Sequence, residues 1–304
     1  MKKYFMLILS IVLYFSGIGA QTADSKQKRA GHVILIGLDG WGAYSVPKAE
    51  MPNVKKQMEQ GCYTLTKRSV FPSSSAANWA SMFMGAGPEL HGYTEWGSKT
   101  PEFPSKIIKK NNIFPTIFQL LRDNDPKAGI ACFYEWEGIK FLVDTISLDY
   151  HAQVPDYNKH PDALCEMSVK YILGEKPELL AVCFDNPDHT GHEDGHDTPA
   201  YYSKLRELDD YIGRIIKATE QAGIIDQTVF IITSDHGGIQ KGHGGKTVAE
   251  METPFIIAGK GIKRGGCFEE SMMQFDIAST IAYIFALKQP QVWIGRPMLN
   301  VFEK

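Results

Sequence analysis

Three continuous apolar runs, each followed at once by acidic or histidine residues, constrain the fold of this chain more than any other feature. They are residues 32–38, 179–184 and 229–233. Runs of this length and composition are typical of strands that are covered on both faces of a parallel sheet. In open α/β sheets, the residues just past the carboxyl ends of the strands line the ligand crevice. We therefore expect the polar residues behind the three runs to meet at one edge of a sheet.

The segment behind the third run gives the strongest indication of a metal site. Residues 234–245 read SDHGGIQKGHGG and contain Asp235, His236 and His243. The five glycines of this segment let the backbone bend closely enough to bring His243 back to the end of the strand. Taken alone, a glycine-rich loop with two histidines is as readily a solvated turn. Acidic clusters at other strand ends therefore decide between the two interpretations.

Such clusters follow the other two runs. Asp39 comes directly after the first run, and the densest polar segment of the chain, DNPDHTGHEDGH at 185–196, follows the second. Asp188 and His192 stand four residues apart around Gly191, so that a turn or a single helical coil directs both side chains at one ion. Three other polar residues of this segment are expected to cap the chain, to support a ligand or to face solvent: Asp185, His189 and His196.

A serine run marks a candidate site for an anion. Residues 71–87 read FPSSSAANWASMFMGAG, in which serines give way to alanines and to apolar residues at helix-compatible spacing. The strand-to-helix junction falls on the serines and puts Ser75 at or near the N-cap, where backbone N–H groups and the helix dipole stabilise phosphate. On helix grounds alone, Ser75 is more often only a cap. Asn78 is either a second donor or a surface amide.

The rest of the chain alternates between strands and helices. Helices are predicted at 52–61, 114–124, 161–173, 201–222 and 269–286, and further strands at 63–70, 128–133 and 254–259. This alternation indicates an α/β fold, a three-layer α/β/α sandwich around a mainly parallel central sheet. Residues 31–304 are expected to form a single catalytic domain, with loops around 89–160 that cover a pocket.

The amino terminus predicts export. Residues 1–20 carry Lys2 and Lys3, then an apolar run and small residues, a pattern typical of a secretory signal peptide cleaved after Ala20. An uncleaved membrane anchor is the alternative, for which the apolar run is short. Residues 21–30 are polar and are expected to form a disordered lead-in. We therefore expect a secreted or periplasmic protein without a stable membrane anchor.

The composition of the chain indicates which partners and which metal ligands to expect. A formal net charge of −3 over 304 residues gives no basic surface for nucleic acid. The five cysteines are an odd number without CxxC spacing, so they are expected to be free thiols. Metal ligands are therefore expected among the carboxylates and imidazoles.

The candidate ligands are numerous enough for two metal ions. They are Asp39, Asp188, His192, Asp235, His236 and His243. Imidazole together with carboxylate oxygen suits zinc, and suits manganese or iron less well. Two metal ions roughly 4 Å apart clamp the attacking and leaving oxygens of a phosphoryl transfer. A hydroxyl bound to one of them loses its proton near neutral pH, which would make Ser75 a nucleophile without a histidine base.

Short motifs occur in a fixed order along most of the chain. They are LDG at 38–40, PN at 52–53, PSSSAAN at 72–78, PELHG at 88–92, NPDHTGH at 186–192, SDHGG at 234–238 and GHGG at 242–245. As an ordered set they resemble the nucleotide pyrophosphatase/phosphodiesterase branch (type I phosphodiesterases) of the alkaline phosphatase superfamily. The resemblance implies an alkaline-phosphatase-like fold and a catalytic centre with two zinc ions.

The resemblance also implies a role for each site residue. The ligands of one zinc would be Asp188, His192 and His243, and those of the other Asp39, Asp235 and His236. Ser75 would bridge toward the second zinc, and Asn78 would bind a phosphate oxygen. Branch members more often have threonine as the nucleophile and an aromatic residue directly after it, where this chain has Ala76. Glutamate is commoner at the position of Asn186.

The prediction that follows is a secreted two-zinc phosphodiesterase or nucleotide pyrophosphatase-like hydrolase of small-molecule phosphate esters. Ser75 would form a covalent phosphoryl-enzyme intermediate. A phosphomonoesterase or phosphonate hydrolase on the same site is the alternative, and a binding protein that retains the metals without turnover is a further one. A sulfatase is disfavoured, because sulfatases of the superfamily carry a modified Cys or Ser in a C/S-x-P-x-R context that PSSSAAN lacks.

Overall fold

The computed structural model describes residues 28–109 and 112–304. The predicted signal peptide, residues 1–20, and residues 21–27 of the predicted lead-in lie outside the described residues. Residues 28–30 are described, and there the Arg29 amide donates to the Ile284 carbonyl at 2.8 Å while Ala30 is buried. The prediction of a disordered lead-in was therefore wrong for these last residues, which pack against the rest of the chain.

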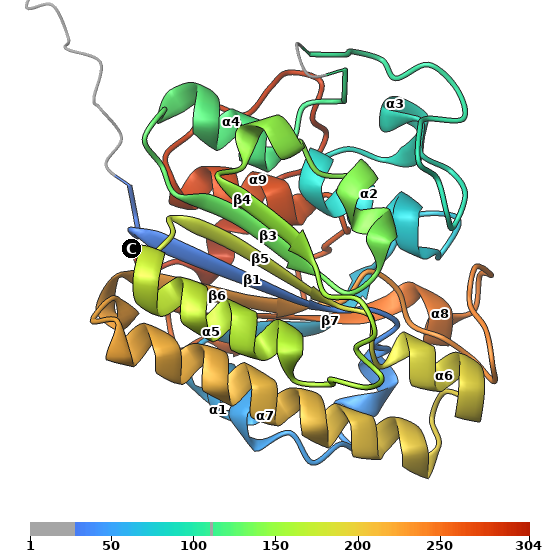
Figure 1. Cartoon of the computed structure of the whole chain (residues 1–304). Coiled ribbons are helices and arrows are strands. Elements are labelled where there is room, and N and C mark those ends of the chain that lie inside the picture. The colour runs from blue at the N-terminus through green and yellow to red at the C-terminus, as the bar shows by residue number, and fades with distance from the viewer. Residues whose placement is uncertain (1–27, 110–111) are drawn as a thin grey trace, which may run out of the picture.

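A single sheet contains all eight strands of the described residues, in the order β4–β3–β5–β1–β6–β7–β2–β8 (Figure 1). The strands are β1 His32–Leu38, β2 Cys62–Arg68, β3 Ile130–Tyr134, β4 Tyr150–Gln153, β5 Leu179–Phe184, β6 Thr228–Thr233, β7 Glu252–Gly259 and β8 Gly266–Cys267. β7 runs antiparallel to both of its neighbours, and the other pairs are parallel. The prediction of a mainly parallel sheet is confirmed.

Helices cover both faces of this sheet. The α-helices of the described residues are α1 Pro52–Gln60, α2 Ser75–Met84, α3 Pro88–His91, α4 Ile117–Asn124, α5 Ala163–Glu175, α6 Asp188–Asp194, α7 Pro199–Gln221, α8 Val248–Met251 and α9 Asp276–Ile284. α2, α4 and α9 lie on one face, and α1, α5 and α7 on the other (Figure 1), which confirms the three-layer sandwich. None of the helices between residues 28 and 304 that are described is both long and apolar enough to cross a membrane.

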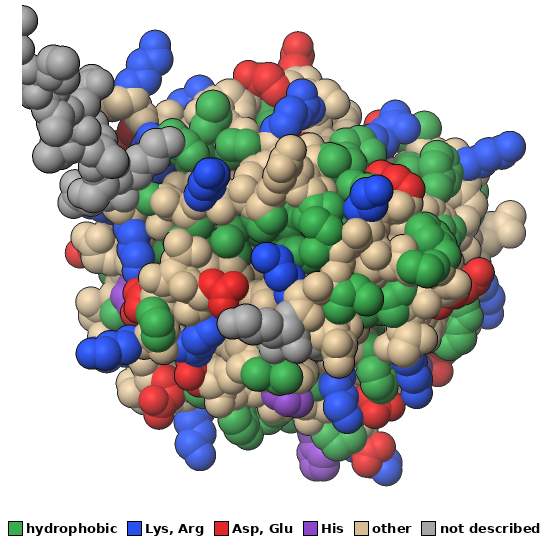
Figure 2. All heavy atoms as spheres, turned by 90° about the horizontal axis from the view of Figure 1, so that it is seen from above, with side chains coloured by type: hydrophobic (Ala, Val, Ile, Leu, Met, Phe, Trp, Pro, Cys, Tyr) green, Lys and Arg blue, Asp and Glu red, His purple; other side chains and the backbone are tan. Residues whose placement is uncertain are grey.

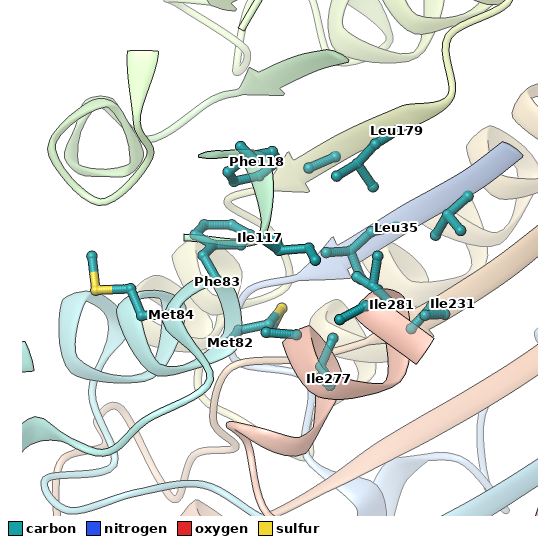
Figure 3. Close-up of a cluster of buried hydrophobic side chains, with 14 of the residues drawn as sticks. Leu35, Met82, Phe83, Met84, Ile117, Phe118, Leu179, Ile231, Ile277 and Ile281 are labelled. Atoms are coloured by element: carbon teal, nitrogen blue, oxygen red, sulfur yellow. The ribbon is translucent and has the colours of Figure 1, made fainter. Parts of the chain in front are cut away.

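Alternate residues of β1 point into two separate cores, which explains its unbroken apolar sequence. Leu35 lies in the core beneath α2, α4 and α9, whereas Ile34 and Ile36 lie in the core beneath α1, α5 and α7. Figure 3 shows strand residues of the first core against helix residues: Leu35, Leu179 and Ile231 with Met82, Phe83, Ile117, Phe118, Ile277 and Ile281. Each such side chain contributes roughly 1.5–3 kcal/mol when fully buried. Above this layer, hydrophobic side chains lie between lysine, arginine and acidic side chains on the surface (Figure 2).

The register of the central strands places the three polar segments side by side. Gly37 of β1 pairs with Cys183 of β5 and with Thr233 of β6. Parallel strands in this register end at the same edge of the sheet, where ligands of such folds bind. Asp39 and the segments that begin at residues 185 and 234 therefore leave the sheet together, as the sequence predicted.

The last helix is shorter than predicted, since α9 begins at Asp276 and not near residue 269. The preceding residues pair with the end of β2 instead. The Arg68 amide donates to the Met272 carbonyl at 3.0 Å, and the Gln274 amide donates to the Arg68 carbonyl at 2.8 Å. The Asp276 carboxylate then accepts from the Met273 amide at 2.7 Å. These bonds replace a helical turn with extended backbone, which hydrophobic periodicity does not reveal.

A buried carboxylate on α7 caps the start of α1. Asp209 accepts hydrogen bonds from the amides of Asn53 and Val54 at 2.9 and 2.8 Å, and from the Asn53 side chain at 3.0 Å. The first amides of a helix have no partner within the helix, so an outside acceptor stabilises them. Gly213 of α7 leaves room for this contact, because a Cβ there would lie 2.7 Å from Asn53 Nδ2.

We expect Asp209→Ala to lower the free energy of unfolding by about 2 kcal/mol, because it removes bonds to a charged acceptor and leaves amides unpaired. Urea unfolding followed by circular dichroism measures the change. Asp210→Ala, at the exposed next position of α7, is the control and should change the free energy by less than about 0.5 kcal/mol. An equally small change in Asp209→Ala would contradict the capping role.

Candidate metal centre

The structure gathers all the predicted ligands at the carboxyl edge of the sheet. They are Asp39 after β1, Asp188 and His192 in α6, Asp235 and His236 after β6, and His243 in the loop before α8. Ligand atoms of five of them form two groups, each with all atoms within 4.8 Å of one another: Asp188, His192 and His243 in the first group, and Asp39, Asp188 and His236 in the second. Asp235 belongs to neither group, although its Oδ2 lies 3.3 Å from His236 Nε2. Asp188 belongs to both groups, so the two candidate sites adjoin.

In the first group, two imidazoles face one carboxylate. Asp188 Oδ2 lies 3.1 Å from His192 Nε2 and 3.7 Å from His243 Nε2. His192 Nδ1 donates to the Lys241 carbonyl at 2.9 Å, and His243 Nδ1 donates to the Ser73 carbonyl at 3.0 Å. A carbonyl oxygen only accepts, so the proton lies on Nδ1 in both rings. When the rings are neutral, Nε2 therefore keeps its lone pair for a metal ion.

His236 lies at the centre of the second group. Its Nε2 is 3.1 Å from Ser75 Oγ. The same nitrogen is 3.3 Å from Asp39 Oδ1 and 3.3 Å from Asp235 Oδ2. His236 Nδ1 donates to the Gly237 carbonyl at 2.8 Å, which again leaves the lone pair on Nε2. Ser75, the buried first residue of α2, thus adjoins this group, one position after the N-cap.

Three buried carboxylate oxygens have no hydrogen-bond partner among the described residues: Asp39 Oδ1, Asp188 Oδ1 and Asp235 Oδ2. On two of these side chains the other oxygen is engaged. Trp79 Nε1 donates to Asp39 Oδ2 at 2.9 Å, and the Gly40 amide donates to Asp235 Oδ1 at 3.2 Å. Buried polar atoms without a partner are costly and call for an explanation such as an ion. Three carboxylates, together with three imidazoles whose Nδ1 atoms donate to carbonyls, fit a pair of divalent cations such as zinc.

Burial and the proximity of like charges shift the pKa values of these groups. Burial and the charge of Asp235 raise the pKa of Asp39 well above its usual range. Burial and the charge of Asp188 raise the pKa of Asp235 to about 8. Burial lowers the pKa of His236 to about 3, and the hydrogen bond with Asp188 raises the pKa of His192 to about 9. A divalent cation favours ionised carboxylates and neutral imidazoles and would therefore offset this crowding.

Asn78 does not lie where the sequence interpretation put it. Its side chain is fully buried, and its Oδ1 accepts from the Val70 amide at 2.6 Å. Its Nδ2 donates to the carbonyls of Pro72 and Ser74 at 2.9 and 3.0 Å. Both amide hydrogens are thus committed to the backbone, so the predicted donation to phosphate is wrong. Asn78 instead fixes the turn that presents Ser75.

His196, expected to support a ligand or to face solvent, is buried beside the centre. Its Nε2 lies 3.6 Å from Asp188 Oδ1. The ring occupies space that side chains at Gly191 and Gly238 would need, since Cβ atoms there would lie 2.4 and 2.2 Å from ring atoms. Burial lowers the pKa of His196 to about 4. A neutral imidazole therefore packs behind Asp188, and these glycines are the sequence signal that could have predicted it.

Lys67 of β2 is a residue that sequence reasoning missed. It is fully buried, its Nζ donates to the Ser234 carbonyl at 2.9 Å, and it also donates to the Gln274 side chain. Burial lowers its pKa to about 7, against the opposing charge of Asp235. A single lysine in a strand gives no sequence signal of such a position. The Lys67 amino group thereby stabilises the segment after β6, which contains His236 of the second group.

A cavity of about 470 Å³ opens beside the first group. Its lining residues are Pro72, Ser74, Glu95, Trp96, His192, His243 and Gly244. Two of them come from the 89–160 region that was expected to cover a pocket. The Trp96 side chain is 67% exposed. The cavity is therefore lined both by the imidazoles of the first group and by an exposed aromatic side chain.

The sequence is similar to known proteins over most of its length. Residues 33–266 match the family model described as type I phosphodiesterase / nucleotide pyrophosphatase. The bis(5′-adenosyl)-triphosphatase enpp4 of Mus musculus is 24% identical over 246 residues, which cover 77% of this chain and 53% of that protein. The ectonucleotide pyrophosphatase/phosphodiesterase family member 1 of Mus musculus is 25% identical over 218 residues, which cover 67% of this chain and 24% of that protein. The chain thus spans about half, or less, of the length of these curated relatives.

Solved structures share the architecture. Murine ectonucleotide pyrophosphatase / phosphodiesterase 5 in complex with AMP matches with a TM-score of 0.68 and 16% identity, over 87% of this chain and 96% of that chain. A 2-O GAG sulfatase matches with a TM-score of 0.71 and 14% identity, over 88% of this chain and 73% of that chain. At these identities the likeness shows the fold alone. It confirms the alkaline-phosphatase-like fold expected from the motifs.

We expect the metal-free protein to lose stability as the pH rises from about 6.5 to about 8.5. Asp235 and His192 have folded-state pKa values raised to about 8 and about 9, so the folded state holds their protons longer than the unfolded state does. The stability that these protons provide is lost as the pH rises through those values. Lys67, with a pKa lowered to about 7, acts in the opposite direction and offsets part of the loss.

Thermal unfolding of chelator-treated protein measures this effect, and a net loss of ~1 kcal/mol corresponds to a fall in Tm of about 3 °C. Added zinc should raise Tm more at the higher pH, since it binds ionised carboxylates and neutral imidazoles. A Tm of the metal-free protein that rises over this interval would contradict the crowded carboxylates as the source of the instability.

Proposed function

The chain belongs to the type I phosphodiesterase / nucleotide pyrophosphatase family, and on that premise we propose that it is a metal-dependent hydrolase of phosphodiester and pyrophosphate bonds. The observation that carries the proposal is the 3.1 Å contact between Ser75 Oγ and His236 Nε2, beside carboxylate oxygens that lack partners. A buried hydroxyl at a helix start, next to candidate ligands for a cation, supports an attack of Ser75 on phosphorus. Residues 31–304 would act as a single catalytic domain.

We propose two zinc ions as the cofactor. Asp188, His192 and His243 would hold one, and Asp39, Asp235 and His236 the other. Equal numbers of imidazoles and carboxylates support zinc, with manganese or iron as alternatives. When bound, the ions supply Lewis-acid polarisation of the phosphate and stabilise the negative charge that develops on its oxygens.

Ser75 is the nucleophile in this proposal. Its Oγ forms a bond to phosphorus while the bond from phosphorus to the first alcohol breaks, and the Ser75 proton passes through solvent to that alcohol. Water then cleaves the phosphoserine ester, which restores the hydroxyl and releases a monoester. Backbone N–H groups and the dipole at the start of α2 stabilise the negative phosphate during both steps.

Nucleotide derivatives are the first substrates to test, since one relative is named a bis(5′-adenosyl)-triphosphatase and one solved neighbour holds AMP. Ala76 stands directly after Ser75, so an aromatic side chain at that position cannot stack on a base here. Secretion or periplasmic location is supported by the lysines, apolar run and small residues of positions 1–20, and by the name of the ectonucleotide relative.

Ser75→Ala is expected to lower kcat by a factor of about 10³ or more, because it removes the attacking atom. Hydrolysis of bis(p-nitrophenyl) phosphate by zinc-loaded protein measures this loss. Elemental analysis should find two zinc ions per chain in wild type and variant, since six other side chains hold them. Ser203→Ala, on the exposed side of α7, is the control and should keep full activity.

Two results would contradict the assignment of Ser75 and the metals. A Ser75→Ala variant within about tenfold of wild type, or roughly 1.4 kcal/mol, would mean that this serine only begins a helix. A single metal ion per chain would exclude the two-zinc site, whatever the activity of the variant.

Diesters are expected to be cleaved faster than monoesters. A monoester dianion carries one more negative charge than a diester, so a site specialised for it needs further positive charge such as an arginine. No lysine or arginine is among the described residues that line the cavity. Lys99 lies 5.2 Å from the centre of the Phe141 ring and lines a different cavity.

The measurement is kcat/KM on bis(p-nitrophenyl) phosphate and on p-nitrophenyl phosphate, which share a leaving group. A preference for the monoester of more than about tenfold, some 1.4 kcal/mol of transition-state binding, would overturn the diesterase assignment. The phosphomonoesterase alternative would then take its place.

A further inference from the structure

A buried imidazole lies beside the candidate metal centre without a hydrogen bond of its own. The side chain of His196 is fully buried, and neither of its ring nitrogens has a hydrogen-bond partner among the described residues. Asp188 Oδ1, which also lacks a partner there, lies 3.6 Å from His196 Nε2. Buried polar atoms without partners are costly, so this pair of atoms calls for an explanation.

The chain turns sharply after α6 and brings His196 back to Asp188, the first residue of the same helix. Gly195 ends the helix with φ of +98°, a conformation that favours glycine, and its amide donates to the Gly191 carbonyl at 2.9 Å. The His196 amide then donates to the Gln240 carbonyl at 2.6 Å, in the loop before α8. The main chain on both sides of the turn thereby fixes the position of His196.

The imidazole and the carboxylate both have little room to change orientation. The backbone of Gly191 and of Gly238 packs against the His196 ring, since Cβ atoms there would lie 2.4 and 2.2 Å from ring atoms. Asp188 is confined in the same way, because a Cβ at Gly40 would lie 2.6 Å from its Oδ1. The 3.6 Å approach of the two side chains is therefore held from several sides.

The two oxygens of Asp188 face different neighbours. Oδ2 lies 3.1 Å from His192 Nε2 and 3.7 Å from His243 Nε2, whereas Oδ1 faces His196. A carboxylate that binds a metal is itself commonly held by a hydrogen bond, and such a partner sets the orientation of the ligand. We propose that His196 is a positioning residue, whose Nε2–H donates to Asp188 Oδ1 and directs Oδ2 toward the ion of the first group. This inference rests on the proposed function.

The proposal also separates the two candidate sites. With Oδ1 engaged by His196, Asp188 has one oxygen left, and that oxygen faces the first group. The second ion then depends on three other side chains: Asp39, Asp235 and His236. His196 acts only through Asp188.

The position of the ring proton tests the proposal without any change to the protein. Long-range 1H–15N correlation spectra of zinc-loaded wild type show which nitrogen of each histidine carries a proton. We expect the His196 proton on Nε2, and the protons of His192, His236 and His243 on Nδ1, where they donate to carbonyls. The spectrum of His196→Gln assigns the signal. A His196 ring with a proton on Nδ1 alone would overturn the proposal.

Zinc affinity separates positioning from packing. His196→Phe keeps an aromatic ring but removes the donor, so one of the two zinc ions should bind about tenfold more weakly in competition with a chelator. His196→Gln keeps an N–H donor and should bind both ions within about threefold of wild type. His189→Gln is the control and should change neither affinity, because His189 contacts Asn158 and Glu193 on α6 and the neighbouring loop, not Asp188.

Two results of this comparison would overturn the inference. Zinc affinities of His196→Phe within about twofold of wild type would mean that the ring only fills space, even if Tm of the metal-free variant falls. An equal loss of affinity in His196→Phe and His196→Gln would likewise show that the donor has no role. Wild type that binds two zinc ions, with affinities that His196→Phe does not change, rejects this inference alone, whereas wild type that binds no zinc rejects the proposed function as well.

Discussion

The crowding of three buried carboxylates at one edge of the sheet is the constraint on which the rest of the structure depends. Asp39, Asp188 and Asp235 approach one another where water cannot screen them, and like charges in such surroundings repel strongly. Hydrogen bonds from neighbouring donors offset part of this repulsion: the Trp79 indole donates to Asp39, and the Gly40 amide donates to Asp235. One oxygen of each carboxylate nevertheless has no partner among the described residues. The folded protein therefore has an excess of buried negative charge at this edge of the sheet, which divalent cations would neutralise.

The packing of the core and the orientation of these carboxylates depend on the same residues. The Trp79 indole lies on Gly37 of β1, where a Cβ would be 2.2 Å from the ring, and the same indole donates to Asp39. Gly40 has φ of +68° and lies against Asp188, which a Cβ there would approach to 2.6 Å. A side chain at either glycine would displace a core residue or a candidate ligand. The end of β1 therefore requires glycine at positions 37 and 40, because only glycine allows the close approach of Trp79 and Asp188.

The sequence predicted the strands that are buried on both faces of the sheet. These strands are the ones that lead into the candidate metal centre. β1, β5 and β6 have unbroken apolar sequences, and their register decides which polar segments meet. β4 was missed because it is a short edge strand with exposed or half-exposed residues, which leave no periodic signal. The position of Asn78 could not be predicted, since its partners are carbonyls whose directions depend on the turn at residues 70–74. The burial of Lys67 likewise depends on contacts with residues far away in the sequence.

The hydrogen bonds of two imidazoles link the loop at residues 237–247 to the rest of the centre. His192 on α6 donates to Lys241 of this loop, and His243 of the loop donates to Ser73, just before α2. The first bond ties the loop to α6 and the second ties it to the segment before α2, and each bond orients the Nε2 atom of its ring. Loss of either bond would therefore change the geometry of the candidate metal site. Because His192 and His243 also line the cavity, the loop that orients their rings shapes the cavity as well.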